Sequence, residues 1–96
     1  EKRMPNAFKN TKLHETLQEL GHLDLIVCGF MSHSSVSTTV RRAKDYGYRC
    51  TLVEDASATR DLAFKDGVIP AAQIHQCEMA VMADNFACVA PTASLI

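Results

Sequence analysis

The sequence predicts an α/β protein in which helices cover a parallel sheet in a three-layer α-β-α arrangement. Two observations support this fold class. Short apolar segments with the length and composition of strands recur along the 96 residues, and segments with helical spacing of apolar residues lie between them. This alternation is typical of parallel sheets, because each helix returns the chain to the start of the next strand.

The first helix is expected over 11–20, after a loop that occupies residues 1–10. Three leucines recur there at helical spacing. Asn10 or Thr11 can cap the start of this helix, and Gly21 is a natural residue to end it. The leucine stripe predicts one buried helix face.

The first strand is expected over 23–30, because its centre is continuously apolar. Such a run is typical of a strand that is covered on both faces. Right-handed connections place the later helices, at 33–46 and 70–84, together on one face of the sheet. We therefore expect helix 11–20 on the opposite face and further strands of a larger sheet beyond the first strand, since that edge would otherwise be bare.

The remaining elements are expected in the order helix 33–46, strand 48–53, helix 70–84 and strand 86–90. Gly47 ends the first of these helices, and Pro70 is suited to the first position of the second. The residues between 54 and 69 are expected to form a loop. About three strands and three helices result, which is the size of the C-terminal part of a larger parallel sheet.

Composition excludes several classes of function. The net charge of −1 gives no electrostatic argument for a nucleic-acid or membrane partner, and no apolar run reaches the roughly 20 residues that span a bilayer. The N-terminus is polar and unlike a signal peptide. None of the four cysteines forms a CxxC pair, and Cys28, Cys50 and Cys88 lie in strand-like runs. We expect the cysteines to be small core residues that neither bind zinc nor form a disulfide framework. Such cysteines are typical of a protein in the reducing cytoplasm.

The segment from Gly29 to Thr39 is the candidate site. It joins the first strand to a helix and is rich in small polar side chains, with three serines before the helix pattern and no cysteine. A strand, a tight turn and a helix start bring such side chains next to unpaired backbone N–H groups and the positive end of the helix dipole. This arrangement suits an anion or a developing oxyanion.

The chain resembles the isochorismatase-like cysteine hydrolases, which include nicotinamidases and relatives of N-carbamoylsarcosine amidase. The matching segments are Lys2 with Ala7-Phe8 and Thr11-Lys12-Leu13, Leu25 to Gly29, Met31 to Thr39, Ala43 to Tyr48, and Val53 to Ala56. The resemblance covers nearly the whole chain but only the latter half of a family domain. It implies that residues 1–96 are the C-terminal portion of a single Rossmann-like domain that hydrolyses a C–N bond of a small molecule, with no cofactor and no metal held by this chain.

The resemblance also implies roles for particular residues. The family uses an Asp–Lys–Cys triad, in which the lysine matches Lys2 and the cysteine matches Ser35, while the aspartate has no counterpart in this chain. The oxyanion hole resembles one built from the backbone N–H groups of Met31 and Ser35. A non-proline cis peptide usually precedes the first of these, which makes Phe30–Met31 the candidate bond. Phe30 and His33 are candidates for the substrate wall.

Ser35 leaves three interpretations open: an engineered replacement of cysteine, a natural variant with lost or altered chemistry, or a simple helix-capping serine. A hydroxyl is far harder to ionise than a thiol, so we expect weakened or absent hydrolysis unless a base assists. His33 is such a base only if its side chain turns toward Ser35. The alternative is a pseudoenzyme that binds a small molecule or serves assembly, and vinyl-ether hydrolysis is a minor third class.

Other polar residues are expected to have structural roles. His14, His22 and His75 are placed on helix surfaces or ends, without metal-ligand spacing. Asp55, which follows the second strand, is expected to cap the next loop or to close a hydrogen-bond network. The bare sheet edge predicts association, either as a homo-oligomer or with the missing N-terminal half.

Overall fold

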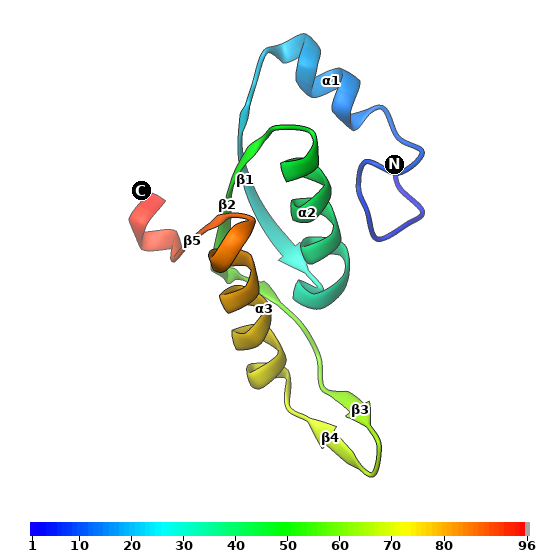
Figure 1. The fold of residues 1–96 in the computed structure, drawn as a ribbon, viewed down its shortest axis with the longest axis vertical. Coiled ribbons are helices and arrows are strands. Elements are labelled where there is room, and N and C mark those ends of the chain that lie inside the picture. The colour runs from blue at the N-terminus through cyan, green and yellow to red at the C-terminus, as the bar shows by residue number, and fades with distance from the viewer. Residues whose placement is uncertain (96) are drawn as a thin grey trace.

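The computed structural model describes residues 1–95, which form an α/β structure with one parallel sheet (Figure 1). In chain order the elements are α1 (Leu13–Leu20), β1 (Asp24–Phe30), the π-helical turn η1 (Ser32–Val36), α2 (Ser37–Asp45), β2 (Arg49–Ala58), β3 (Leu62–Phe64), β4 (Gly67–Ile69), α3 (Ala71–Asn85), β5 (Cys88–Ala90) and the 3-10 turn η2 (Thr92–Leu95). The predicted α/β class with a parallel sheet is confirmed.

The sheet has the strand order β1-β2-β5, and both pairs of neighbours are parallel. Helices α2 and α3 lie side by side over one face of it (Figure 1). The core between them and the sheet contains the fully buried side chains of Val40, Leu52 and Met82. Two successive right-handed connections that advance in one direction produce this layer, as the sequence predicts.

Helix α1 packs against the same core as α2 and α3, through Leu13 and Leu17. His14 stacks on Tyr46 with ring centroids 3.8 Å apart, and its Nδ1 lies 2.8 Å from the Tyr48 hydroxyl. The expectation that the first helix covers the opposite face is therefore wrong. A right-handed connection that enters β1 from its free edge advances in the same direction as β1 to β2 to β5, so its helix belongs on the same face.

The opposite face of the sheet is uncovered in the described chain. Exposure alternates along β1, and Ile26 and Phe30 are 67% and 62% exposed. The expectation that this strand is covered on both faces is wrong for residues 1–95. Cys50 is buried as predicted, but Cys28 and Cys88 are exposed rather than in the core, because they lie on the side of the sheet that no helix covers.

A hairpin, β3 with β4, occupies part of the region that the sequence predicted as a loop. Figure 1 shows it extending away from the sheet, beyond the start of α3. Its tight turn places Lys65 at a φ of 55°, and Asp66-Gly67 completes the turn. An Asp-Gly pair between apolar residues is a strong hairpin signal, so the sequence contained the information for this element.

Several boundaries differ from the predicted ones. Strand β2 continues to Ala58 instead of ending at 53. Pro70 has an extended ψ of 145° and precedes α3 as its N-cap, rather than forming its first residue. Helix α1 begins at Leu13, and the Thr11 hydroxyl oxygen accepts a bond from the Leu13 N–H at 3.3 Å. These are shifts at element ends, where local sequence signals are weakest.

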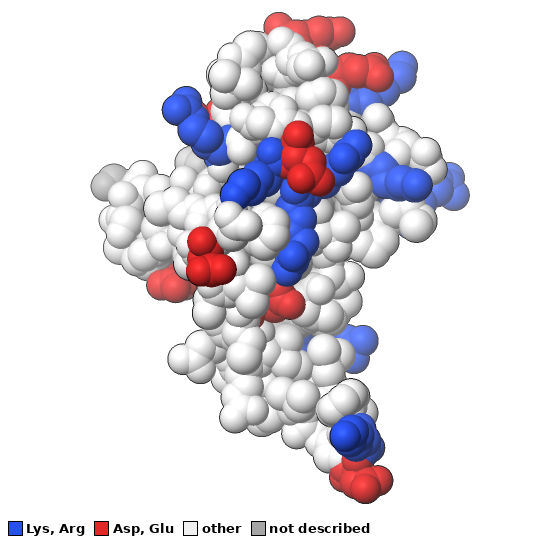
Figure 2. Space-filling view, in the orientation of Figure 1, with Lys and Arg blue, Asp and Glu red and all other residues white. Residues whose placement is uncertain are grey.

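Charged side chains of both signs mix on the surface. In the view of Figure 2, basic side chains gather around the upper part of the molecule, and acidic side chains lie among them. Arg41, Arg42 and Lys44 contribute exposed basic groups from α2. Within residues 1–95, every helix is too short or too polar to cross a membrane.

Candidate functional site

The site begins where β1 ends. Gly29 has a φ of 139°, a conformation that residues with a side chain rarely adopt, and the register between β1 and β2 shifts next to it. The following peptide bond, Phe30–Met31, is cis, as the resemblance implied. The chain therefore leaves the sheet in a sharp turn at the carboxyl ends of the strands, where open α/β sheets bind ligands.

The turn η1 leads directly into α2. The Met31 carbonyl accepts bonds from the N–H groups of Ser34 at 3.0 Å and Val36 at 3.2 Å. These bonds fix the backbone on both sides of Ser35, whose side chain is half-buried. Oxyanion stabilisation by the N–H groups of Met31 and Ser35 stays a prediction.

Lys2 and Ser35 are brought together as the sequence predicts. The Lys2 ammonium donates to the Ser35 Oγ at 3.2 Å and to the Met4 carbonyl at 3.1 Å. The two residues come from the N-terminal loop and from the turn η1. A lysine ammonium at hydrogen-bond distance favours negative charge on its partner atom in general.

The N-terminal loop is held on α2 by Thr39, a residue that sequence reasoning did not single out. The Thr39 Oγ1 accepts from the Ala7 N–H at 2.9 Å and donates to the Pro5 carbonyl at 3.3 Å. The Ala7 carbonyl accepts from the Thr11 hydroxyl at 2.7 Å, and the neighbouring Phe8 is buried. The only sequence signal for these contacts is the position of Thr39 on the helix that follows the serine-rich turn.

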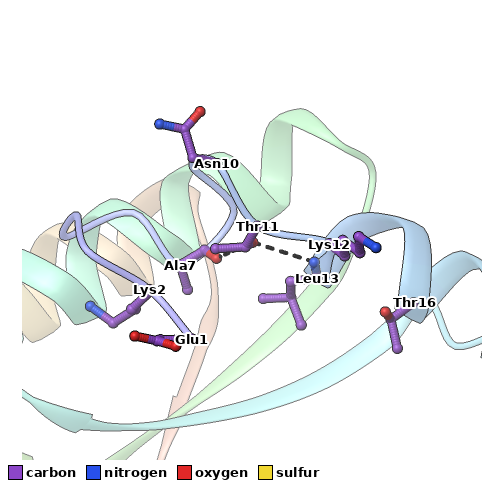
Figure 3. A pocket seen from close by; sticks show the side chains of 8 residues that line it. All are labelled: Glu1, Lys2, Ala7, Asn10, Thr11, Lys12, Leu13 and Thr16. Carbon is purple, nitrogen blue, oxygen red and sulfur yellow. Dashed lines mark hydrogen bonds between the residues drawn. The ribbon is translucent and has the colours of Figure 1, made fainter.

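A cavity of about 190 Å³ lies beside this pair. Its walls are formed by Lys2, Ala7, Val27, Cys28, Gly29, Phe30, Ser35, Val36 and Thr39. A larger hollow of about 630 Å³ shares two of those residues, Lys2 and Ala7. Figure 3 shows this hollow between the N-terminal loop and the start of α1, with β1 passing beneath it.

Phe30 and His33 take different positions. Phe30 lines the cavity, and its role as a substrate wall stays a prediction. The His33 Nδ1 forms a hydrogen bond with the hydroxyl of Thr59, just before the β3–β4 hairpin. Among residues 1–95, no hydrogen bond joins His33 to Ser35. The side chain of His33 is therefore held by a partner other than the hydroxyl that it would have to deprotonate.

Sequence reasoning missed a second buried hydroxyl in the turn. Ser32 is fully buried, and its Oγ lies 2.7 Å from the Nδ1 of His75 on α3. The Nε2 of the same ring lies 2.9 Å from the carbonyl oxygen of Glu54 in β2. His75 is half-buried and bonded on both sides, whereas the sequence predicted a helix-surface residue.

Two titratable groups near the sheet have shifted pKa values. Asp55 accepts from the hydroxyl of Thr92 at 2.7 Å and from its N–H at 2.8 Å, and these bonds lower the pKa of the carboxyl group. Asp55 thus caps η2, in line with the structural role expected for it. Burial raises the pKa of the Cys50 thiol. Within the described residues, no group of three or more His, Cys, Asp or Glu side chains is arranged to hold a metal ion.

The geometry brings three features together. It places a hydroxyl on a strand-to-helix turn, a lysine ammonium next to that hydroxyl, and a cavity open to a small molecule. A lysine that donates to a nucleophile favours its anionic form but does not itself remove the proton. Among the described residues, no carboxylate forms a hydrogen bond with Ser35.

The chain is similar to known proteins both in sequence and in fold. The family described as "Isochorismatase domain" matches residues 1–94. The uncharacterized isochorismatase family protein YddQ from Bacillus subtilis is 44% identical over 95 residues, which are 99% of this chain and 53% of that protein. A solved structure of an isochorismatase hydrolase from Oleispira antarctica superposes with a TM-score of 0.93 at 35% identity and covers 98% of this chain and 50% of its own.

Two matches have more specific names. Streptothricin hydrolase from Streptomyces noursei is 37% identical over 70% of this chain and 28% of its own length. Nicotinamidase 3 from Arabidopsis thaliana is 39% identical over 62% of this chain and 30% of its own length. The chain spans about half the length of the curated relative that it matches over its whole extent. Because the family match covers nearly all of its residues, the chain belongs to the isochorismatase family of hydrolases.

Proposed function

We propose that this chain is the C-terminal portion of a domain that hydrolyses a C–N bond of a small amide, with Ser35 at the nucleophile position and Lys2 beside it. The 3.2 Å approach of the Lys2 ammonium to the Ser35 hydroxyl is the observation that carries the proposal. The similarity to a streptothricin hydrolase and a nicotinamidase supports an amide as the substrate class.

In the proposed reaction, the Ser35 oxygen attacks the amide carbonyl carbon, and its proton passes to a carboxylate outside the described residues. The carbonyl electron pair moves to the oxygen, which the N–H groups of Met31 and Ser35 would stabilise. The C–N bond then breaks, the leaving amine takes the proton, and water hydrolyses the resulting ester. Lys2 stabilises the charge on the nucleophile. Turnover is expected to be weak, because a hydroxyl is a poor nucleophile without a well-placed base.

The second candidate is a non-catalytic member of the same family. Its supporting observation is that His33 is bonded to Thr59 and leaves the Ser35 hydroxyl without a histidine base. In this case the cavity beside Lys2 binds a small molecule without converting it. A ligand would then bind with the same affinity whether residue 35 carries a hydroxyl or a thiol.

The S35C variant distinguishes these candidates in the full-length protein that contains this chain. We expect it to raise release of ammonia from nicotinamide or a related small amide at least tenfold, because a thiol ionises far more easily next to a lysine. The S34C variant is the matched control, since it adds the same thiol one residue away. Equal turnover of the wild type and the S35C variant on a panel of amides and imides would favour the non-catalytic candidate.

We further propose that the uncovered face of the sheet is an assembly surface for the rest of the domain. Ile26 and Phe30 expose apolar side chains there, and such a face rarely stays open to water. A homo-oligomer is the alternative. Light scattering of the 96-residue chain, alone and mixed with the other half of the domain, separates the two. Binding of the other half supports the first, self-association alone supports the second, and a monomer with no affinity for the other half contradicts both.

A cytoplasmic location is the last part of the proposal. All four cysteines are free thiols in the structure. Disulfides are rare in reducing compartments, which agrees with a chain that keeps four unpaired thiols. Fractionation of cells that express the full-length protein tests this location directly.

A further inference from the structure

The serine-rich turn is tied to two other elements through one histidine. The Ser32 Oγ lies 2.7 Å from the Nδ1 of His75, and the His75 Nε2 lies 2.9 Å from the Glu54 carbonyl oxygen. Ser32 belongs to η1, His75 to α3 and Glu54 to β2. The imidazole therefore links the turn that carries Ser35 and the helix α3 to the central strand β2.

The partners of His75 define which nitrogen carries its proton. A carbonyl oxygen can only accept, so the Nε2 that faces Glu54 is the protonated nitrogen. In the neutral ring the Nδ1 is then an acceptor, and the Ser32 hydroxyl donates to it. Each group in this series has a partner, which matters because Ser32 is fully buried and an unpaired buried hydroxyl is costly.

The hydrogen bond between Ser32 and His75 is important because of where Ser32 lies in the turn. Ser32 follows Met31 and comes three residues before Ser35, and the N–H groups of these two flanking residues are the proposed oxyanion donors. The Ser32 side chain is buried toward α3, whereas Ser35 lines the cavity with Lys2. Donors and nucleophile must be held to within about 0.5 Å of the productive geometry, and the link anchors the turn from its buried side.

We propose that His75 is a positioning residue that holds the turn for reaction at residue 35 through the Ser32 hydroxyl. This inference rests on the proposed function, because it assigns His75 a task in the same site. His75 does not line the cavity beside Ser35, so its effect is exerted through Ser32.

The test uses the full-length protein with the S35C substitution as background. Adding H75L removes both hydrogen bonds, and we expect kcat to fall 10- to 100-fold with KM changed less than threefold, since a displacement of about 1 Å costs about 100-fold. H75N keeps a side-chain oxygen near the position of Nδ1 and is expected to recover most of the loss. H75Q reaches Glu54 instead of Ser32 and is expected to stay as slow as H75L. Q76L, an exposed neighbour on α3, is the matched control and should leave kcat unchanged.

Two measurements do not depend on turnover. Long-range ¹⁵N–¹H NMR spectra of His75 should show the Nε2–H tautomer, and the S32A variant should change the Nδ1 signal. The rate at which iodoacetamide alkylates the new thiol at position 35 should fall in H75L and recover in H75N. If no amide is hydrolysed but these two results hold, the proposed function fails and the positioning role stands.

Other outcomes overturn the inference. One is an H75L variant whose kcat and alkylation rate match those of its background. Another is equal loss in H75L and H75N together with a parallel fall in thermal stability, which would show that His75 only supports folding. An Nδ1–H tautomer in the NMR spectra would also contradict it.

Discussion

The Lys2 ammonium and the Ser35 hydroxyl oxygen lie 3.2 Å apart, although 33 positions separate the two residues in the chain. The N-terminal loop reaches the serine-rich turn because Thr39 on α2 bonds to Ala7 and Pro5 of that loop. The contact is thus produced by the packing of the loop on α2. Its consequences are open to measurement.

Lys2 should contribute most to turnover when the side chain of residue 35 is charged. In the S35C background, K2M removes a charge-assisted hydrogen bond of about 1.5–3 kcal/mol, so we expect turnover to fall about 10- to 100-fold. K9M, which removes an exposed lysine from the same loop, is the control and should have little effect. Steady-state kinetics on one amide substrate measure both. An unchanged kcat in K2M would separate Lys2 from the chemistry.

Thr39 should stabilise the loop that carries Lys2. T39V has nearly the same shape but leaves the Ala7 N–H and the Pro5 carbonyl without their partner. We expect a loss of about 1–2 kcal/mol in the free energy of unfolding, measured by urea denaturation. T38V, at the preceding position of α2, is the matched control. Equal stability of T39V and the wild type would mean that the loop is held by other contacts, such as those of buried Phe8.

The lowered pKa of Asp55 predicts that the stability of the fold depends on pH in the acid range. Its hydrogen bonds to Thr92 lower the pKa of the carboxyl group below its ordinary value of 3.8. A depressed folded-state pKa adds stability that is present above the unfolded pKa and is lost as pH falls through the folded pKa. D55N should therefore be less stable than the wild type at neutral pH, and the difference should shrink at pH values below 3.8. Thermal melts from pH 7 downward measure it, and a difference that grows in acid would be contrary to this account.

Truncation of a side chain should change the free energy of unfolding by different amounts on the two faces of the sheet. Leu52 points to the core side of the sheet and is 0% exposed, so L52A should cost about 2–5 kcal/mol. Ile26 is 67% exposed in this chain, so I26A should cost less than about 0.5 kcal/mol in it. If the rest of the domain covers this face, I26A should cost several times more in the full-length protein. Chemical denaturation of both forms tests the proposed assembly surface.

Local pattern was sufficient for the alternation of strands and helices, but not for the pairing of Lys2 with Ser35. The pairing came from the resemblance, since nothing near Lys2 in the sequence points to a residue 33 positions away. The hairpin at 62–69 was missed although Asp66-Gly67 is a recognisable turn signal. It was overlooked because its strands are only three residues long.

The remaining differences depend on contacts that sequence periodicity does not encode. The face on which α1 packs was set by the direction in which the chain enters β1, and the leucine stripe alone is compatible with either face. The exposure of Cys28 and Cys88 follows from the absence of a covering layer in residues 1–95. The hydrogen bond between Ser32 and His75 joins positions 43 residues apart, and no local sequence pattern predicts it.

The most direct test of the central claim is the pKa of a thiol at position 35. In full-length S35C, the pH dependence of iodoacetamide alkylation reports that pKa, and the same measurement on S35C/K2M shows what Lys2 contributes. If Lys2 and residue 35 form the reaction centre, the pKa is at least one unit lower when Lys2 is present. Identical profiles for the two variants would show that the lysine does not act on this position, and the account of the site would be wrong.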